Sequence, residues 1–212
     1  MTGKEQMEVL RKKEAIIEDI RKRYPKIDFP EPVLEPIYYG RLTKTEIPNR
    51  KLILDKTTKN PFDIVSDRYE VIHHEEVLHK FLNAVPKEFG NPKIDAFIMK
   101  AGARALFQME FPDIKDFNVN GSPAHPMYRL KNSYDRSSHL HYSAGAMEQV
   151  CTNGMMAFKQ HSKGSAKHIG TTISSFDLEN RMKESMKDIS ETHKLWLAWA
   201  EKKINEAQIQ TV

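Results

Sequence analysis

Metal-binding and nucleophilic side chains gather between residues 125 and 168. They are His125, His139, His141, Cys151, His161 and His168. Cys151 is the only cysteine of the chain, so it forms no internal disulfide. Its thiol could be a nucleophile if His139 or His141 acted as the base that favours the thiolate. The alternative is a structural thiol in the core, because free cysteine is among the most buried residue types.

A metal site is the second chemistry that these residues could support. On a strand, His139 and His141 would point to the same face, as a two-ligand site requires. The spacing of the histidines and Cys151 matches no established zinc pattern. The glycines are too scattered for a phosphate-binding loop, and no pair of carboxylates stands out. We therefore predict no metal, no cofactor and no catalytic residue, and we do not expect an enzyme.

A basic segment surrounds these residues. Residues 127–170 contain six basic and two acidic residues, and this excess of four equals the net charge of +4 of the whole chain. The basic residues are Arg129, Lys131, Arg136, Lys159, Lys163 and Lys167. A concentrated positive patch attracts polyanions, whereas an even distribution mainly favours solubility. The segment is compatible with a polyanion-binding surface and with an ordinary solvated face.

Tyrosines alternate with these charges. Tyr128 and Tyr134 lie close in sequence to the three basic residues between 129 and 136. A basic groove with stacking rings is the arrangement that binds single-stranded nucleic acid, although packing in the core would explain each tyrosine equally well. The lysines at every fourth position of 159–167 predict either a helix with one basic face or a flexible basic loop. We predict that the six cations and the two tyrosines form a nucleic-acid-binding site.

The rest of the sequence predicts the elements that position this surface. Apolar residues recur at helical spacing over 4–24, and four prolines between 25 and 36 predict an extended connector. The predicted strands are 37–42, 51–55, 68–72, 127–132 and 139–143. The other predicted elements are a helix at 74–84, a β-hairpin at 93–111, and a strand or short helix at 145–150. An antiparallel sheet with separate helices belongs to the α+β class.

A long helix that is capped by Ser174, Ser175 or Asp177 is predicted to extend to about residue 210. Its apolar residues step by three or four over about five heptads, which is close to a coiled-coil seam. Such a stripe packs either on its own sheet or on a neighbouring subunit. We divide the chain into an N-terminal helical arm with a proline-rich connector (1–36), an α+β core (37–172) and a long C-terminal helix (173–212). The two terminal helices are expected to form a homo-oligomer.

Three motifs resemble those of a known family. They are R-Y-x-V at Arg68–Val71, N-S-x-D-x-S at Asn132–Ser137 and V-C-x-N-x-M at Val150–Met155. In this order they resemble the phage/plasmid-like protein family of unknown function, over about residues 62–157. The resemblance implies an origin in a mobile element and implies no catalytic residues. The predicted architecture is also similar to that of phage single-strand annealing proteins, which form rings or filaments on DNA.

The leading hypothesis is a phage protein that binds single-stranded DNA, or RNA, and anneals strands in replication or recombination as a non-catalytic oligomer. One alternative is a phage interaction protein that binds a host or virion protein and no nucleic acid. A third hypothesis is a metal-dependent enzyme that uses His139, His141 and Cys151. No apolar segment has the length of a membrane span, so we expect no membrane partner and a location in the cytoplasm of a bacterial host.

Overall fold

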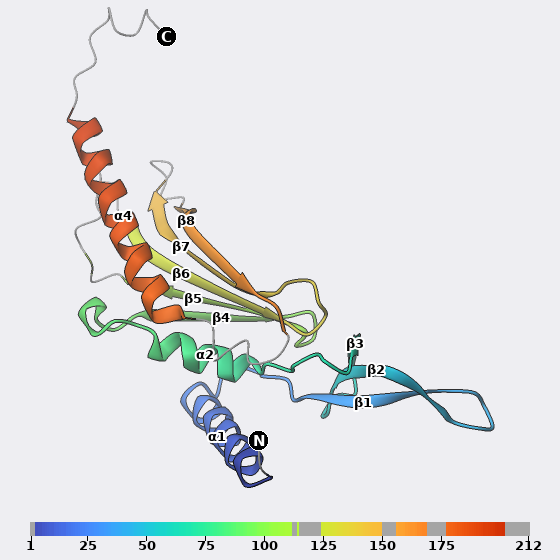
Figure 1. Ribbon diagram of the computed structural model, residues 1–212. Helices are drawn as coiled ribbons and strands as arrows, with labels where there is room; N and C mark the ends of the chain where they lie inside the picture. The colour runs from blue at the N-terminus through green and yellow to red at the C-terminus, as the bar shows by residue number, and fades with distance from the viewer. Residues whose placement is uncertain (1–2, 112–113, 115–123, 150–155, 169–176, 202–212) are drawn as a thin grey trace, which may run out of the picture.

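The computed structural model describes residues 3–111, 114, 124–149, 156–168 and 177–201. Two antiparallel sheets form the centre of the molecule, with helices toward both ends of the chain (Figure 1). The predicted α+β class is confirmed. Figure 1 shows the smaller sheet at one end of the larger one, and the C-terminal helix at the opposite end.

The smaller sheet has three strands in the order β1-β2-β3. They are β1 (Pro32–Tyr39), β2 (Thr45–Asp55) and β3 (Pro61–Ser66). The predicted strand 51–55 is confirmed as part of β2, whereas β1 begins earlier than predicted, inside the proline-rich segment. The predicted strand 68–72 is wrong. The segment has a single bridge at Tyr69 and no continuous strand, and its alternation arises because Tyr69 and Val71 pack on a small core of Ile53, Val65 and Tyr134.

The larger sheet has five strands in sequential order, β4 to β8. They are β4 (Lys93–Met99), β5 (Arg104–Glu110), β6 (Ala124–Ser133), β7 (Leu140–Gln149) and β8 (Met156–Ala166). The predicted hairpin is confirmed as β4 and β5. Gly102 closes its turn with a φ of +93°, and a Cβ there would lie 2.8 Å from Pro30. Residues 145–149 are part of strand β7, so the strand is correct and the alternative of a short helix is not.

Strand β8 is the main error of the sequence-based prediction, which expected a helix or a loop at 159–167. Among the strands that the structure describes, β8 lies at the edge of the sheet and pairs only with β7. Its sequence lacks the apolar residues that usually identify a strand, because small residues (Ser162, Gly164 and Ala166) lie on its inner face. Lysine on an edge strand is a common device against unwanted pairing with other chains.

Helices cover one face of the larger sheet. They are α2 (His74–Asn83), followed by a short 3₁₀ turn at Lys87–Phe89, and α4 (Leu178–Ala200). The hydroxyl of Tyr128 donates to the carbonyl of Met182 (3.0 Å), and that of Tyr142 donates to Ser185 Oγ (2.9 Å). The α4 residues Leu178, Met182, Ser185, Ile189 and His193 are buried. The first half of the predicted apolar stripe therefore packs within the chain.

The N-terminal helix α1 (Gly3–Arg23) confirms the helix predicted at 4–24 and is anchored to α2. Arg21 Nε donates to the fully buried carboxylate of Glu75 at 2.7 Å. Lys13 Nζ lies 2.8 Å from the carboxylate of Glu76. Near the start of α1, three large apolar side chains remain exposed, namely those of Met7, Val9 and Leu10.

Candidate nucleic-acid interface

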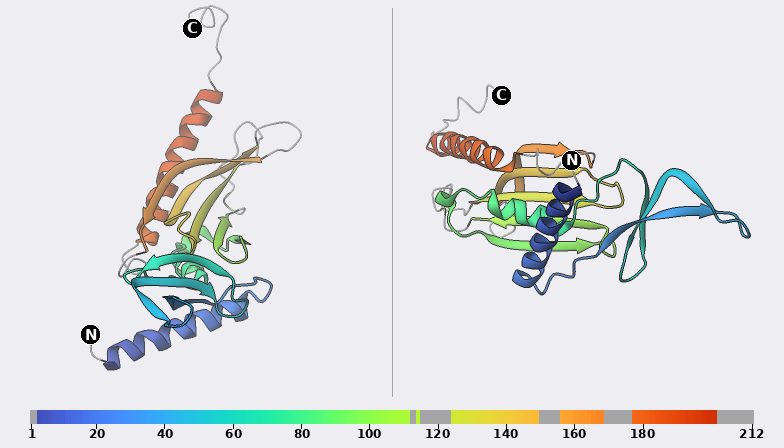
Figure 2. Two further views of the ribbon diagram at one scale, coloured as in Figure 1. Left: turned by 90° about the vertical axis from the view of Figure 1, so that its right-hand side faces the viewer. Right: turned by 60° about the horizontal axis from the view of Figure 1, so that its bottom comes forward.

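The second face of the larger sheet is not covered by any of the helices that the structure describes, and we call it the open face. Directly paired residues of antiparallel strands point to the same side. One such row crosses all five strands and consists of Asp95, Gln108, Arg129, Ser143 and Lys163. Both views in Figure 2 show α4 along the other side of this sheet. Arg129 and Lys163 are therefore brought to one surface from two different strands.

A second row adds another cation and a histidine. Lys131 pairs with His141, which in turn pairs with Ser165. The pKa of His141 is lowered by partial burial and by the positive charges of Lys131 and Lys163. Both lysines are thus close enough to the imidazole to act on it. We call Arg129, Lys131, His141 and Lys163 the basic cluster.

Arg129 is held in place by an aromatic ring. Its guanidinium carbon lies 3.9 Å from the centre of the Phe158 ring, a cation–π contact. Its Nε is buried and has no hydrogen-bond partner within the described part of the chain. Burial lowers the pKa of Arg129, but a guanidinium stays charged at neutral pH. The side chain is therefore a fixed cation with unused donor capacity.

The nearby acids do not neutralise the lysines of the cluster. Lys93 lies 3.3 Å from the carboxylate of Asp95 and 3.9 Å from that of Glu110, so it offsets one of these two negative charges. Glu110 also lies close enough to Arg129 to favour its charged form. Among the residues with described positions, no carboxylate lies within ion-pair distance of Lys131 or Lys163. The open face consequently keeps an excess of positive charge over its β6–β8 half.

Lys159 lies on the other side of the sheet. A bulge at His161 shifts the pairing of β8, so that Ala144 pairs with Ser162 but Gly145 pairs with Gln160. Lys159 then pairs with Ala146, a buried residue on the helix-covered face. This correction separates Lys159 from Lys163, which the regular spacing of the lysines had placed together.

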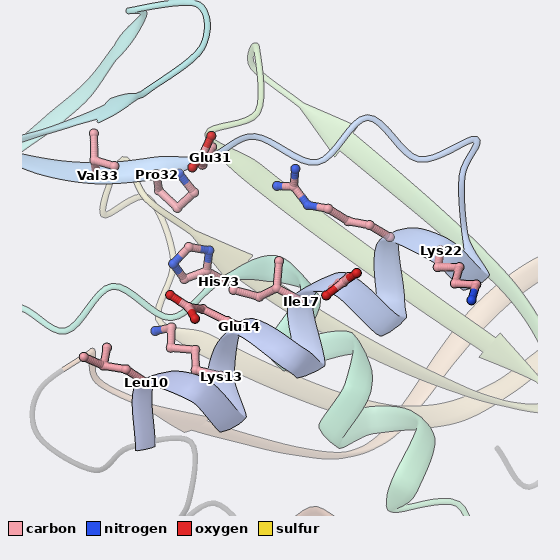
Figure 3. Close-up of a pocket in the computed structure, with 11 residues that line it drawn as sticks. Leu10, Lys13, Glu14, Ile17, Lys22, Glu31, Pro32, Val33 and His73 are labelled. Atoms are coloured by element: carbon pink, nitrogen blue, oxygen red, sulfur yellow. The ribbon is translucent and has the colours of Figure 1, made fainter. Parts of the chain in front are cut away.

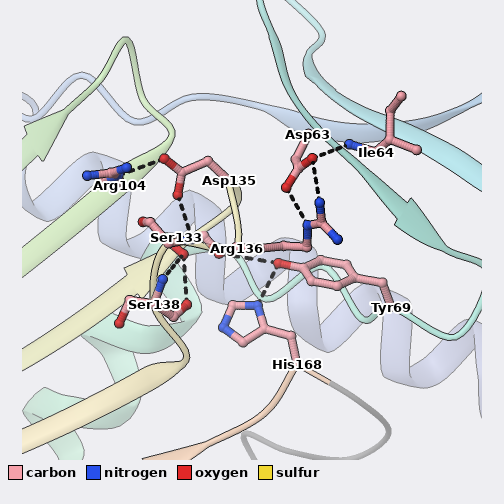
Figure 4. A network of polar contacts seen from close by, with 10 residues as sticks. Asp63, Ile64, Tyr69, Arg104, Ser133, Asp135, Arg136, Ser138 and His168 are labelled. Atoms are coloured by element: carbon pink, nitrogen blue, oxygen red, sulfur yellow. Dashed lines mark hydrogen bonds and ion pairs between the residues drawn. The ribbon is translucent and has the colours of Figure 1, made fainter.

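Arg136 lies where the two sheets meet (Figure 4), and Lys167 lines the same pocket as Arg136. Arg136 forms a bidentate ion pair with Asp63 of β3, with Nη2 donating to Oδ1 at 3.1 Å. Lys167 lines a small pocket of about 170 Å³ together with Tyr69, His139 and His168. Since the charge of Arg136 is already paired, its role at this junction is first of all structural.

The two tyrosines predicted to stack on bases are buried instead. Tyr128 and Tyr134 have no exposed surface, because both point into the core. The Tyr134 ring stacks on His74, with a centroid distance of 4.2 Å, and on Phe62 at 5.5 Å. Its hydroxyl accepts a hydrogen bond from the backbone N–H of His74 at 2.9 Å. Neither ring is accessible to a base.

The N-S-x-D-x-S motif has structural roles. Asn132 Nδ2 donates to the carbonyl of Ile72 and lies 2.9 Å from His74 Nδ1. Ser133 Oγ donates to the carbonyl of Ser138 at 2.8 Å, which closes the turn between β6 and β7. Asp135 accepts from the backbone N–H of Ser137 and pairs with Arg104 at 2.6 Å (Figure 4).

The two histidines of the alternative metal-site hypothesis lie in different surroundings. His141 is part of the basic cluster, whereas His139 lies at the sheet junction, where it lines the small pocket with His168. Cys151 lies outside the described residues. Within the described ranges, no group of three His, Cys, Asp or Glu residues could hold a metal ion.

A larger pocket of about 770 Å³ lies between α1 and the start of β1 (Figure 3). Two of its three cations, Lys13 and Arg21, are already paired with Glu76 and Glu75, and the third is Lys22. Burial lowers the pKa of His73 to about 4, so its ring is neutral. Three carboxylates, those of Glu14, Glu18 and Glu31, also line the pocket, so it offers no preference for an anion. We therefore place the candidate site on the open face.

Sequence analysis did not identify two aromatic residues of the open face. Phe97 of β4 lies in the row of Leu106, Lys131 and His141, and 45% of its surface is exposed. Phe158 of β8 supports Arg129. Strand alternation in the predicted hairpin could have identified Phe97, because it lies out of phase with the apolar positions 94, 96 and 98.

Comparison with known proteins identifies the family. Residues 61–212 match the family described as "Domain of unknown function (DUF932)". No curated protein and no solved structure matches the chain. No helix in the described ranges is long and apolar enough to cross a membrane. The match includes all three motifs and extends beyond residue 157, so the expected membership in a family of unknown function is confirmed. The chain belongs to the DUF932 family.

Proposed function

We propose that this chain is a phage protein that binds single-stranded DNA on the open face and acts in replication or recombination. The observation that supports the proposal most directly is the basic cluster. Cations from β6 and β8 share one uncovered surface, and the described residues provide no acidic partner for Lys131 or Lys163. Neutralisation of phosphates by such cations supplies most of the affinity of nonspecific nucleic-acid binding.

The open face also offers a place for bases. Phe97 is exposed on β4, and Leu106 lies between Phe97 and Lys131 in the same row. Phosphates on the basic cluster would direct the bases of a strand toward this apolar half of the face. Stacking on an aromatic ring contributes about 1–3 kcal/mol per base and depends little on sequence. Binding is therefore expected to be sequence-tolerant, as annealing requires.

Self-association completes the proposal. The exposed apolar side chains of Met7, Val9 and Leu10 lie near the free end of α1 and suit a contact with a second subunit. Strand annealing needs several subunits on one strand and no catalytic residue. The same apolar surface favours the alternative hypothesis, a protein that binds a host or virion partner. The phage origin rests on the motif resemblance.

Charge reversal in the basic cluster tests the proposal. The variant Lys131→Glu/Lys163→Glu should bind a labelled single strand at least about 10-fold more weakly than the wild type, because two phosphate contacts become repulsive. Fluorescence anisotropy at low salt measures the change.

The matched control is Lys26→Glu/Lys87→Glu, which alters the net charge equally at exposed sites away from the open face. It should bind nearly as the wild type does. Equal losses in both variants would show that only net charge matters and would contradict the proposed site. No binding by the wild type would favour the protein-partner hypothesis.

A further inference from the structure

The hairpin of β1 and β2 extends beyond the rest of the small sheet. Strand β3 pairs with β2 only from Arg50 onward, so residues 38–49 form a two-stranded ribbon. Figures 1 and 2 show this ribbon projecting from the body on the side away from α4. We call this ribbon, together with Arg50 at its base, the arm (residues 38–50). At about 3.3 Å per residue, the distance from Pro36 to the tip is roughly 20 Å.

The tip of the arm has a defined conformation. Tyr38 pairs with Glu46 and Tyr39 with Thr45, and residues 40–44 form the turn. Gly40 has a φ of +92°, and a Cβ there would lie 2.8 Å from the carbonyl oxygen of Thr43. Glycine is therefore needed to close this turn, and it fixes the direction in which the following residues project.

Large side chains on the arm are unusually exposed. Leu42 at the tip is 99% exposed, and the exposed fractions of Tyr38 and Tyr39 are 51% and 60%. A leucine at the end of a projecting ribbon contributes nothing to the core of its own chain. Together with Tyr38 and Tyr39 it gives the arm an exposed apolar surface, which is typical of an interaction site.

The charge of the arm indicates the chemistry of that partner. Residues 38–50 include three cations, Arg41, Lys44 and Arg50, and one acid, Glu46. None of the three cations has an acidic partner within ion-pair distance in the described part of the chain. Arg41 and Lys44 lie on either side of Leu42. A nucleic-acid duplex carries negative phosphates on its outside and stacked bases that can be reached through its grooves. A positive ribbon with an apolar tip is complementary to both features.

We propose that the arm enters the minor groove of duplex DNA, with Arg41 and Lys44 on the phosphates and Leu42 between two base pairs. Apolar wedges flanked by cations unstack a base step and kink the duplex in this way. The proposal goes beyond single-strand binding, because the open face and the arm are separate surfaces. Together they would hold a junction between single-stranded and duplex DNA.

Two arm variants test the proposal against duplex DNA. In Arg41→Gln/Lys44→Gln, duplex affinity measured by anisotropy should fall about 10-fold, because two phosphate contacts are lost. In Leu42→Ala, affinity should fall less, but DNA bending should disappear, as followed by energy transfer between dyes at the two duplex ends. Both residues of the double variant are exposed, so the fold is expected to remain intact.

The controls separate this proposal from the function of the open face. Lys26→Gln/Lys87→Gln and Leu195→Ala repeat the same changes at exposed positions elsewhere and should leave duplex binding and bending unchanged. Single-strand affinity should be retained in both arm variants. Duplex affinity and bending equal to the wild type in the arm variants would overturn the proposal. A change in oligomeric state by ultracentrifugation with unaltered duplex binding would also overturn it, in favour of an arm that contacts another subunit.

Discussion

At the scale of single residues, a buried polar network fixes the start of α2 against the sheet. His74 is fully buried, and its Nε2 lies 3.0 Å from the carbonyl of Gly102, while Asn132 donates to its Nδ1. Burial lowers the pKa of His74 to about 3. The ring is therefore neutral, with the proton on Nε2, and is a structural group that takes no part in acid–base chemistry.

The variant Asn132→Ala tests this network. Removal of the amide leaves His74 Nδ1 and the carbonyl of Ile72 without their donor, so the free energy of unfolding should fall by about 2–3 kcal/mol. Urea denaturation measures the loss. Asn83→Ala is the matched control, because Asn83 is exposed and bonds only to the side chain of His79 among described residues. A loss below about 0.5 kcal/mol in both variants would contradict the importance of the network.

The pH dependence of binding tests the role of His141. Its pKa lies below the usual value in the free protein, so it is neutral at pH 7. A bound phosphate favours the imidazolium, so the complex takes up a proton. Affinity for a single strand should therefore rise as the pH falls from 7.5 to 6, and His141→Gln should flatten this slope. His79→Gln, on α2, should leave it unchanged, and an unchanged slope in His141→Gln would exclude contact with phosphate.

At the scale of elements, the bulge in β8 decides which lysines belong to the site. Sequence periodicity identified the helices, the hairpin and β6, because their apolar residues repeat with a clear period. It could not identify β8, because most residues on the helix-covered face of this strand are small. It also could not identify the bulge, in which His161 is the additional residue of β8. A slip of one residue moves each side chain to the other face. Tyr128 and Tyr134 were misjudged for a different reason, because the sequence alone does not show which face of the sheet is covered.

The substitution Gly145→Ala tests the bulge. A Cβ at Gly145 would lie 1.9 Å from the backbone oxygen of Lys159, so β8 must move. The free energy of unfolding should fall by about 1–3 kcal/mol, and single-strand affinity should fall because Lys163 is displaced. Gly164→Ala is the control on the neighbouring strand, where the closest atom belongs to the flexible end of Arg181. Equal stability of the two variants would show that the bulge is not needed.

At the scale of the whole molecule, the two sheets present two different surfaces to nucleic acid. The open face has cations spread over a broad sheet, whereas the arm concentrates its contacts at a tip. The ion pair of Arg136 with Asp63 and the hydrogen bond from the Tyr69 hydroxyl to the Ser133 carbonyl (3.2 Å) join the two sheets. These contacts hold the base of the arm against the larger sheet. The arm precedes the part of the chain that matches the family.

The most direct test of the central claim is the salt dependence of single-strand binding. On single strands, log affinity falls with log salt with a slope of about −0.7 per phosphate neutralised. Neutralising two cluster residues in Lys131→Gln/Lys163→Gln should therefore make the slope less steep by about 1.4 relative to the wild type. Lys26→Gln/Lys87→Gln should keep the wild-type slope. If the slope of the cluster variant equals that of the wild type, the open face does not bind the phosphates.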